Sequence, residues 1–429
     1  MKYSGNPWIG NIPCSWDVER IKTIFKERTE LSEDGSETLL SVSEYYGVAN
    51  RSEKVSEGEF VSRAATLVGY KKCYVGDLVS NIMLAWKGSM GIAEIEGIVS
   101  PAYCVYEPSP RIYPKYYHYL FRTSLYTSIF RLYSKGIIDS RLRLYSPYFF
   151  DISAIIPSLP EQQQIASFLD RKCAEIDEMI ALQEKIIEEL KEYKQSVITE
   201  AVTKGLNPDV PMKDSGIEWI GEIPDHWNIC RLRNLGDTQN GISKGGEFFG
   251  SGYPFLSYSD IYKNFSTPNP PSGLIESSAK EREQYSALRG DVFFTRTSET
   301  IEEIGISSTC LESIDNACFA GFLIRFRPRT NHLHEGFSKY YFRSNIHRAY
   351  FVKEMNLVIR ASLSQDLLKS LPVLLPAIEE QKLISTFLDK RCTEIDNLIS
   401  IKLSKIDSLK EYKKSIIYEY VTGKKVVTE

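Results

Sequence analysis

The chain has 429 residues and a net charge of −4, and its content of 42% hydrophobic and 25% charged residues is that of a folded globular protein. This length allows two or three domains, and the composition excludes a chain that is disordered throughout. The N-terminus, MKYSGNPWIG, lacks the apolar stretch of a signal peptide, and no apolar run reaches the length of a membrane span. We therefore expect a cytoplasmic protein with no membrane partner. The eight cysteines contain no Cys-x-x-Cys pair, which indicates reduced thiols and no zinc site.

Positive charge is concentrated in two segments, although the chain as a whole is acidic. Residues 111–150 contain seven Lys or Arg against one acid, and residues 321–370 contain nine against three, so each segment carries +6. Phosphate binding depends on local charge and not on the total. Either segment alone is equally well interpreted as a solvated face, but their matching places in the chain favour nucleic-acid binding.

The N-terminal segment occurs twice. Residues 2–22 (KYSGNPWIGNIPCSWDVERIK) match residues 213–233 (KDSGIEWIGEIPDHWNICRLR) at a constant offset of 211. The longer segments that follow each copy resemble each other only faintly. A frame that is repeated around divergent inserts predicts one architecture that presents two different recognition surfaces.

Each divergent segment mixes strand-like and helix-like stretches, which predicts an α+β fold. An amphipathic helix rich in Tyr and Arg is expected over 114–133 in the first segment, and its counterpart over 336–351 in the second. The expected strands are 66–75, 77–84, 97–106, 290–297 and 319–328.

Two long helical segments follow the divergent segments and are copies of each other. Residues 161–203 align without a gap on residues 380–422 at an offset of 219, with about half of the positions identical. Both carry an apolar heptad seam. Equal seams favour two helices packed on each other over two separate amphipathic helices, and the chain order favours an antiparallel pair. The expected pairing residues are Ile176, Ile180, Ile187, Leu190, Ile395, Ile399, Ile406 and Leu409.

Lysines interrupt both seams at equivalent positions, Lys194 and Lys413. Their stems can extend along the seam and carry the ammonium group to water. Alternatively, polar seam residues can fix the register of the two helices. The first interpretation is the more common one.

These patterns divide the chain into a first globular domain with its Trp-Ile-Gly segment, a long helix, a linker with the second Trp-Ile-Gly segment, a second globular domain, and a second long helix with the C-terminal tail. The expected boundaries are 1–156, 157–204, 205–227, 228–375 and 376–429.

Candidate DNA contacts lie in turn segments of both globular domains. Small hydroxyls, cations and an aromatic residue in turns suit contacts with phosphates and base edges. Each residue alone is more readily interpreted as an ordinary surface side chain, so the prediction rests on the groups. They are Trp86, Lys87, Ser89, Arg141 and Arg143 in the first domain and Thr295, Arg296, Thr297, Ser298, Arg360 and Ser362 in the second.

Motifs for catalysis are weak. Residues 269–272 (NPPS) are similar to the Asn-Pro-Pro-Tyr loop of adenine methyltransferases, but Ser272 replaces the aromatic residue that stacks on a flipped base. The glycine-rich stretch 241–252 lacks the Gly-Lys-Ser/Thr of a phosphate-binding loop. The five histidines form no metal-binding pattern. We expect no catalytic residue and no metal site.

The repeated motifs resemble those of the specificity (S) subunits of Type I restriction–modification systems. Trp-Ile-Gly-x-Ile-Pro-x-x-Trp occurs twice, and each long helix begins with Glu-Gln-x-x-Ile-x-x-Phe-Leu-Asp. The stretch from Gly290 to Pro328 is also similar to a target-recognition domain of that family. One departure is that Glu379 stands where the first copy has Pro160. The resemblance covers nearly the whole chain.

The resemblance implies two target-recognition domains, each reading one half of a split, asymmetric DNA sequence, and two antiparallel helices that set their spacing. It implies double-stranded DNA, two methylation (M) subunits and restriction/translocase (R) subunits as partners. The chain itself is expected to hold no cofactor, because S-adenosylmethionine, ATP and Mg belong to those partner subunits in the family.

Two alternatives stay open. One is an orphan DNA-binding scaffold of another phage-defence system, which only its partners would distinguish. The other is a self-sufficient methyltransferase, which the missing cofactor loop disfavours. The recognised bases do not follow from the sequence, because base choice depends on how side chains are placed in the groove.

Overall fold

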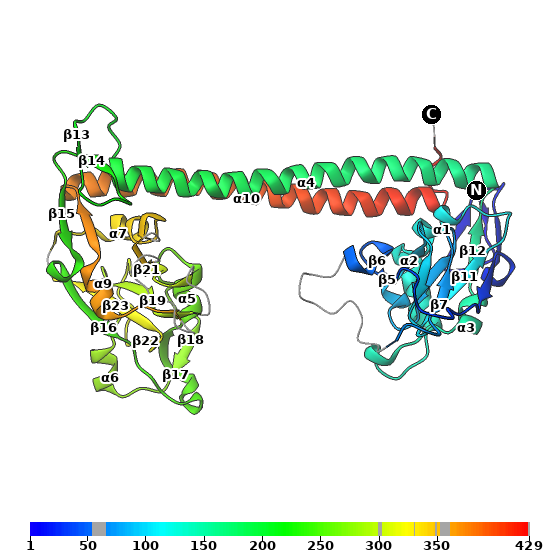
Figure 1. Ribbon diagram of the computed structural model, residues 1–429, viewed down its shortest axis with the longest axis horizontal. Coiled ribbons are helices and arrows are strands. Elements are labelled where there is room, and N and C mark those ends of the chain that lie inside the picture. The colour runs from blue at the N-terminus through cyan, green and yellow to red at the C-terminus, as the bar shows by residue number, and fades with distance from the viewer. Residues whose placement is uncertain (54–65, 299–302, 330, 348–349, 352–360, 428–429) are drawn as a thin grey trace. The chain divides into compact units, whose positions relative to one another are not determined.

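The computed structural model describes residues 1–53, 66–298, 303–329, 331–347, 350–351 and 361–427. The chain forms two compact units, each with a mixed α/β domain and half of each of two long helices (Figure 1). Unit 1 comprises Met1–Glu184 and Leu403–Glu429, and unit 2 comprises Lys185–Lys402. The predicted α+β class is thus confirmed.

A four-stranded antiparallel sheet forms the centre of unit 1, in the order β4-β11-β8-β9. The predicted helix over 114–133 is two helices, because Thr123 leaves the helical conformation and its hydroxyl caps the second one. The strand expected over 66–75 is confined to Lys71–Cys73, and the one over 97–106 is two strands. The elements are β4 (Phe25–Arg28), β5 (Leu40–Ser43), β6 (Gly47–Asn50), β7 (Lys71–Cys73), β8 (Leu78–Asn81), β9 (Met90–Ile92), β10 (Gly97–Val99), β11 (Tyr103–Pro108), α1 (Pro114–Phe121), α2 (Ser124–Tyr133) and α3 (Ser146–Phe150).

Unit 2 contains the equivalent sheet in the order β16-β23-β19-β21, which is the same path through four strands. Its helix begins at Glu335, and the described helix α7 ends at Tyr341; part of the predicted 336–351 helix lies outside the described residues. The elements are β16 (Gly236–Asn240), β19 (Val292–Thr295), β20 (Thr297–Ser298), β21 (Ser307–Thr309), β23 (Leu323–Pro328), α7 (Glu335–Tyr341), β24 (Ala361–Ser362) and α9 (Gln365–Ser370).

The two domains differ most between the first two sheet strands in chain order, β4 and β8 in unit 1 and β16 and β19 in unit 2. In unit 2 that stretch contributes to a separate three-stranded sheet with its own core around Leu256, Ile261 and Phe293. Unit 1 has the hairpin of β5 and β6 in the same part of the chain. The additional elements of unit 2 are β17 (Phe249–Leu256), α5 (Tyr258–Lys263), β18 (Gly273–Ile275), α6 (Ala279–Gln284) and β22 (Cys318–Phe319).

The repeated lead-in folds identically in both units. A short hairpin comes first, and the next strand pairs with the strand that leaves the domain just before the long helix. Each domain is therefore closed at its base, where the chain enters and leaves. The pairs are β1 (Lys2–Tyr3) with β2 (Asn11–Ile12), β3 (Asp17–Arg20) with β12 (Ser153–Ile156), β13 (Met212–Asp214) with β14 (Glu222–Pro224), and β15 (Asn228–Arg231) with β25 (Pro372–Leu375).

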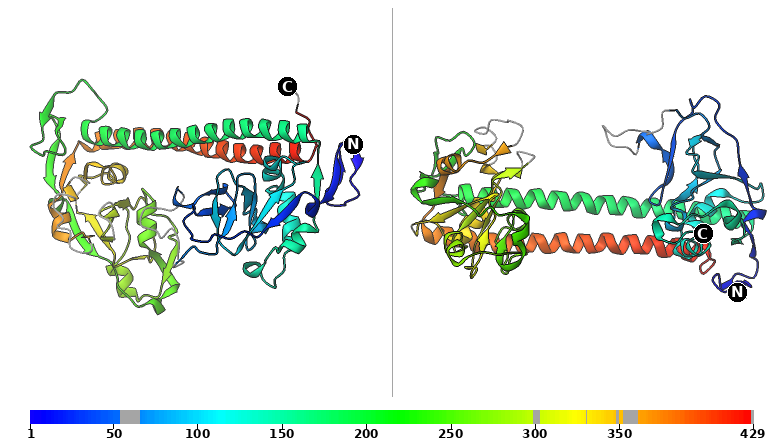
Figure 2. Two further views of the ribbon diagram at one scale, coloured as in Figure 1. Left: turned by 45° about the vertical axis from the view of Figure 1, so that its right-hand side comes forward. Right: turned by 90° about the horizontal axis from the view of Figure 1, so that it is seen from below.

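The two long helices, α4 (Leu159–Lys204) and α10 (Ile378–Val421), are antiparallel within each unit, as predicted (Figures 1 and 2). In unit 1, Phe168 packs on Tyr420 with ring centroids 4.5 Å apart, and nine residues further along α4 Asp177 meets Lys413. In unit 2, Lys194 meets Asp396. None of the eight predicted pairing residues is classed as exposed, and Ile176, Ile187, Ile395, Ile406 and Leu409 are buried.

The two seam lysines form reciprocal ion pairs. Lys194 Nζ donates to both carboxylate oxygens of Asp396 at 2.8 and 2.6 Å, and Lys413 Nζ donates to both oxygens of Asp177 at 2.7 and 2.6 Å. The lysine side chains are only 16% and 29% exposed. The stems thus carry the ammonium groups to carboxylates that are 57% and 58% exposed, and the ion pairs connect the two helices at fixed positions, so both interpretations describe part of the arrangement.

The motif at the start of α4 attaches the first domain to the helix. Glu161 accepts a hydrogen bond from the indole of Trp16 at 3.2 Å. Gln162 is fully buried, accepts from the backbone N–H of Tyr113 and donates to the carbonyl of Pro157, both at 2.8 Å. These bonds tie the lead-in, the domain and the helix together at one point.

The same contacts recur at the start of α10. Glu380 accepts from the indole of Trp227 at 3.1 Å, and the buried Gln381 accepts from the N–H of His334 at 2.8 Å and donates to the carbonyl of Pro376 at 2.9 Å. The two motifs share one spacing because their Glu and Gln side chains bond to equivalent partners in the two units.

The aspartate of each motif holds the tyrosine-rich helix of its domain. Asp170 accepts from the hydroxyl of Tyr119 at 2.6 Å, and Asp389 accepts from that of Tyr340 at 2.7 Å. Burial, and then the carboxylate, raise the pKa of both phenols, so that the tyrosines stay protonated donors.

Replacing Gln162 by Leu is expected to lower the free energy of unfolding of unit 1 by about 2–4 kcal/mol, because a buried N–H and a buried C=O lose their partners. Differential scanning calorimetry and hydrogen exchange at the Tyr113 amide would measure the change. Gln163→Leu, at the exposed neighbouring position, is the matched control and should change stability by less than about 0.5 kcal/mol. Equal effects of the two substitutions would contradict this role.

Candidate nucleic-acid interface

The predicted contact segments lie side by side in each domain. The backbone N–H of Leu144 donates to the carbonyl of Ile82 at 2.9 Å, and the N–H of Leu363 donates to the carbonyl of Arg296 at 2.7 Å. Leu144 and Leu363 are equivalent positions, as are Ile82 and Arg296, each five residues after a Gly-Asp turn. The turn after β8 therefore adjoins the segment before α3 in unit 1, and the turn after β19 adjoins the segment before α9 in unit 2.

The Gly-Asp turns are themselves anchored inside the domains. Asp77 and Asp291 are 1% exposed. Arg28 reaches Asp77 from β4 at 2.8 Å, whereas Arg327 reaches Asp291 from β23 at 2.6 Å. The carboxylate is buried at the same place in both domains, but its arginine partner comes from a different strand in each, so these ion pairs support the fold.

Trp86 and Lys87 form part of an exposed face of unit 1. Lys87 is exposed, and both its ammonium group and the guanidinium of Arg131 lie over the Trp86 ring, 5.2 and 4.9 Å from the ring centroid. Arg131 also pairs with Asp139 at 2.8 Å, which connects this turn to the loop that carries Arg141 and Arg143. The two predicted groups of unit 1 thus belong to one surface.

Part of the +6 charge of residues 111–150 is neutralised inside the unit. Arg111, Lys115 and Arg131 pair with carboxylates, and Arg122 donates to the carbonyls of Glu44 and Tyr45 at 2.8 Å. Apart from Arg122, the cations of this segment that lack a carboxylate partner among the described residues are Lys135, Arg141 and Arg143, all in the loop between α2 and α3. The charge available to phosphates is therefore concentrated on this loop.

Two predicted contact residues are corrected by the structure. Ser89 is 1% exposed and its hydroxyl donates to the carbonyl of Val42 at 3.1 Å. Thr295 is fully buried; its hydroxyl donates to the carbonyl of Glu303 at 2.7 Å and accepts from the N–H of Ile306 at 2.9 Å. Both hydroxyls hold neighbouring loops from within, so neither residue can meet DNA in this conformation.

Thr297 of unit 2 lies on a short two-stranded ribbon, and Arg296 directly precedes it. Strands β20 and β24 pair so that Thr297 faces Ser362 and Ser298 faces Ala361. Arg296 and Thr297 are partly exposed and Ser362 is exposed. Phe322, which is 65% exposed and which sequence reasoning missed, joins them because its carbonyl accepts from the N–H of Arg296. Arg360 lies outside the described residues.

The +6 charge predicted for residues 321–370 does not form an open patch within the described part of unit 2. Arg327, Arg329, Lys339 and Lys369 pair with carboxylates, and Arg343 donates to backbone carbonyls. Arg325 is buried, and this burial lowers its pKa to about 10. The three remaining cations, Arg348, Lys353 and Arg360, lie outside the described residues.

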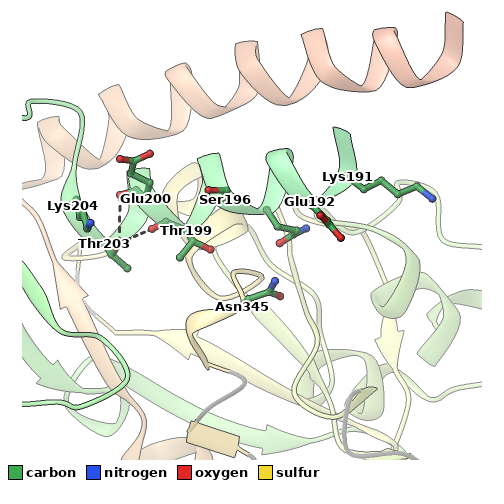
Figure 3. A pocket seen from close by; sticks show the side chains of 9 residues that line it. Lys191, Glu192, Ser196, Thr199, Glu200, Thr203, Lys204 and Asn345 are labelled. Carbon is green, nitrogen blue, oxygen red and sulfur yellow. Dashed lines mark hydrogen bonds between the residues drawn. The ribbon is translucent and has the colours of Figure 1, made fainter. Parts of the chain in front are cut away.

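A groove of about 680 Å³ lies along α4 in unit 2. Figure 3 shows Lys191, Ser196 and Thr199 among the side chains that line it on α4, with Asn345 from the domain below. Two glutamates and two lysines supply its charge, and its lining contains neither a histidine nor a cysteine.

The rest of the described chain offers little for catalysis. Within residues that the structure describes, no cluster of His, Cys, Asp and Glu could hold a metal ion. Burial raises the pKa of the Cys73 thiol to about 12 and that of Cys310 to about 11, which disfavours reactive thiolates. None of the described helices is long and apolar enough to cross a membrane.

These features define a tandem protein with one structural frame and two divergent recognition surfaces. Comparison with known families agrees: the Type I restriction modification DNA specificity domain matches residues 13–192 and 224–424. The chain belongs to this family of Type I specificity proteins.

Relatives and solved structures extend over nearly the whole chain. The MjaVIII specificity subunit of Methanocaldococcus jannaschii is 26% identical, with 96% of this chain and 93% of that protein covered. The EcoKI specificity subunit of Escherichia coli is 28% identical over 65% of this chain and 59% of its own length. The HsdS subunit of Thermoanaerobacter tengcongensis has the same fold with a TM-score of 0.56 and 17% identity, and a chain of a type I R-M assembly has a TM-score of 0.71 and 16% identity; the coverage is 96% of this chain and 98% of the other in both cases.

Arg296→Ala is expected to weaken DNA binding by about 1–3 kcal/mol, or roughly 5- to 150-fold, if its guanidinium contacts a base edge. Binding to duplexes substituted one base pair at a time would locate the contact, since the variant should stop discriminating at a single position. A phosphate contact would instead weaken all duplexes equally and reduce the salt slope by about one. Arg289→Ala, which removes an exposed cation paired with Glu335, is the matched control; identical losses for both variants would count against the site.

Proposed function

We propose that the protein recognises a bipartite, asymmetric DNA site, with one half read by each domain, and directs methylation and restriction subunits to it. The observation that supports this most directly is the contrast between the frame and the surface. The Trp–Glu, Gln–backbone and Tyr–Asp contacts are the same in both units. The equivalent surface positions differ: Ile82 corresponds to Arg296, and Arg143 to Ser362.

The chain acts in this proposal as the non-catalytic recognition subunit. S-adenosylmethionine, ATP and Mg would be held by the M and R subunits, of which two M subunits are expected, and the assembly would work in the cytoplasm. The purified chain should transfer no methyl group to DNA, whereas the chain with its M subunits should do so. An orphan scaffold of another phage-defence system is the alternative, and it would copurify with neither type of subunit.

Exchanging residues 17–155 for the corresponding domain of a relative should change one half of the methylated sequence and leave the other half unchanged, because each frame carries its own surface. Mapping methylated bases in a host that expresses the exchanged chain would measure this. The reciprocal exchange of residues 228–372 should change the other half. If either exchange altered both halves, independent reading would be disproved.

We expect the long helices to set the number of base pairs between the half-sites. Asp177 and Lys194 are 17 residues apart on α4, and Asp396 and Lys413 are also 17 apart on α10. Equal intervals between the two ion pairs are what a continuous antiparallel pairing requires. An insertion in α4 alone would break this equality, so both helices must be extended together.

Four residues inserted after Ile187, with four more after Lys402, would add about 6 Å to both helices. DNA rises about 3.4 Å per base pair. The spacer between the half-sites should therefore grow by one or two base pairs, with the bases of each half retained, and methylome sequencing would report it. Insertion in α4 alone is the control and should reduce activity. Full activity of the double insertion at the original spacing would show that the helices do not measure DNA.

A further inference from the structure

The loop between α2 and α3 in unit 1 has an ordered base and an apolar tip. Lys135 and Arg143 exchange two backbone hydrogen bonds of 2.9 Å, which close residues 136–142 into a loop. A Cβ at Gly136 would lie 2.5 Å from the carbonyl of Arg141, so the narrow neck requires glycine. Leu142 is buried and fixes the returning side of the loop in the domain.

The two residues at the tip point away from the domain. Ile137 is 100% exposed and Ile138 is 54% exposed. Single exposed apolar residues are common on protein surfaces, but here further ones gather at the base of the loop. Leu132 is 73% exposed, Tyr145 47% and Tyr148 39%. A cluster of this kind on a defined loop indicates a binding surface.

The positive charge around these exposed apolar residues indicates which kind of partner binds this surface. Lys135, Arg141 and Arg143 stand beside the tip and, among the described residues, have no carboxylate partner. Lys135 lies 4.6 Å from the centroid of the Tyr148 ring, so the cation and the aromatic residue share one face. The same face continues through Asp139 and Arg131 to Trp86. An apolar tip surrounded by cations complements a groove between two phosphate backbones.

We propose that Ile137 and Ile138 insert as a wedge into a groove of duplex DNA and unstack one base step, while Lys135, Arg141 and Arg143 hold the flanking phosphates. This rests on the proposed function and adds how unit 1 engages its half-site. Apolar side chains placed between base pairs kink the duplex, and the cost depends on the step that is opened. The wedge would thus favour a flexible step in the half-site that unit 1 reads, without a hydrogen bond to any base.

The test uses the full chain assembled with its methylation subunits and duplexes that carry the methylated sequence mapped from its host. 2-Aminopurine replaces each base of the half-sites in turn, because its fluorescence rises when it is unstacked. Apart from the positions where the methylation subunits flip the target adenine, the assembly should raise the fluorescence at one further step. The Ile137→Ser/Ile138→Ser variant should abolish that rise and bind about tenfold more weakly, with the same salt slope. Arg141→Gln should retain the rise and lower the salt slope by about one.

Ile95→Ser is the matched control, since Ile95 is a 41% exposed isoleucine of the same unit between Glu94 and Glu96; it should behave as the unmodified chain. Thermal unfolding checks that all variants fold. The wedge is overturned if the tip variant keeps both its affinity and its fluorescence response, or if the unmodified assembly binds the duplex and unstacks no step besides those at the flipped adenines. It is also overturned if the variant fails to assemble with the methylation subunits, which would make the loop a protein contact. Failure of the unmodified assembly to bind its own methylated sequence would reject the proposed function itself.

Discussion

Two fully buried glutamines, Gln162 and Gln381, determine how each recognition domain is attached to its long helix. Each amide bonds to the backbone of the segment before the Tyr-rich helix and donates to the carbonyl two residues before the long helix. Gln381 also donates to the carbonyl of His332 in the former segment. A buried polar group without its partner is costly, so the geometry of this junction is narrowly defined. Two further contacts stabilise the same junction. The lead-in tryptophan donates to the glutamate that precedes each glutamine, and the aspartate two turns further along the helix accepts from a tyrosine of the domain.

Because the attachment is made by the frame, the rest of each domain is free to differ. The four-stranded sheet keeps its strand order in both units. The stretch between its first two strands in chain order nevertheless builds a hairpin in one unit and contributes two strands to a separate three-stranded sheet in the other. Surface residues at equivalent backbone positions also change in character, from Ile82 to Arg296. The molecule therefore separates the residues that hold the domains from those that would read a ligand.

Sequence reasoning succeeded where the signal is local or repeated. The heptad seam and the constant offset of 219 predicted the paired helices, because both depend only on spacing along the chain. It failed where the answer depends on distant partners. Arg111 is neutralised by Glu19, which is 92 residues away in sequence. The Ser89 hydroxyl donates to a carbonyl 47 residues away. A hydroxyl in a turn looks the same in sequence whether it faces solvent or a neighbouring backbone, which is why Ser89 and Thr295 were wrongly placed on the surface.

The reciprocal ion pairs have a symmetry of their own. Asp177 binds Lys413, and Asp396 binds Lys194, and each partner is the 219-residue counterpart of a residue in the other pair. If residue i contacts j, the counterpart of j contacts the counterpart of i, which is the rule of an isologous twofold interface. One copy of the frame thus carries both complementary halves of its own interface. A polypeptide with a single domain and a single helix would therefore already hold every charge needed to form the same pairs with a second identical molecule, as a homodimer.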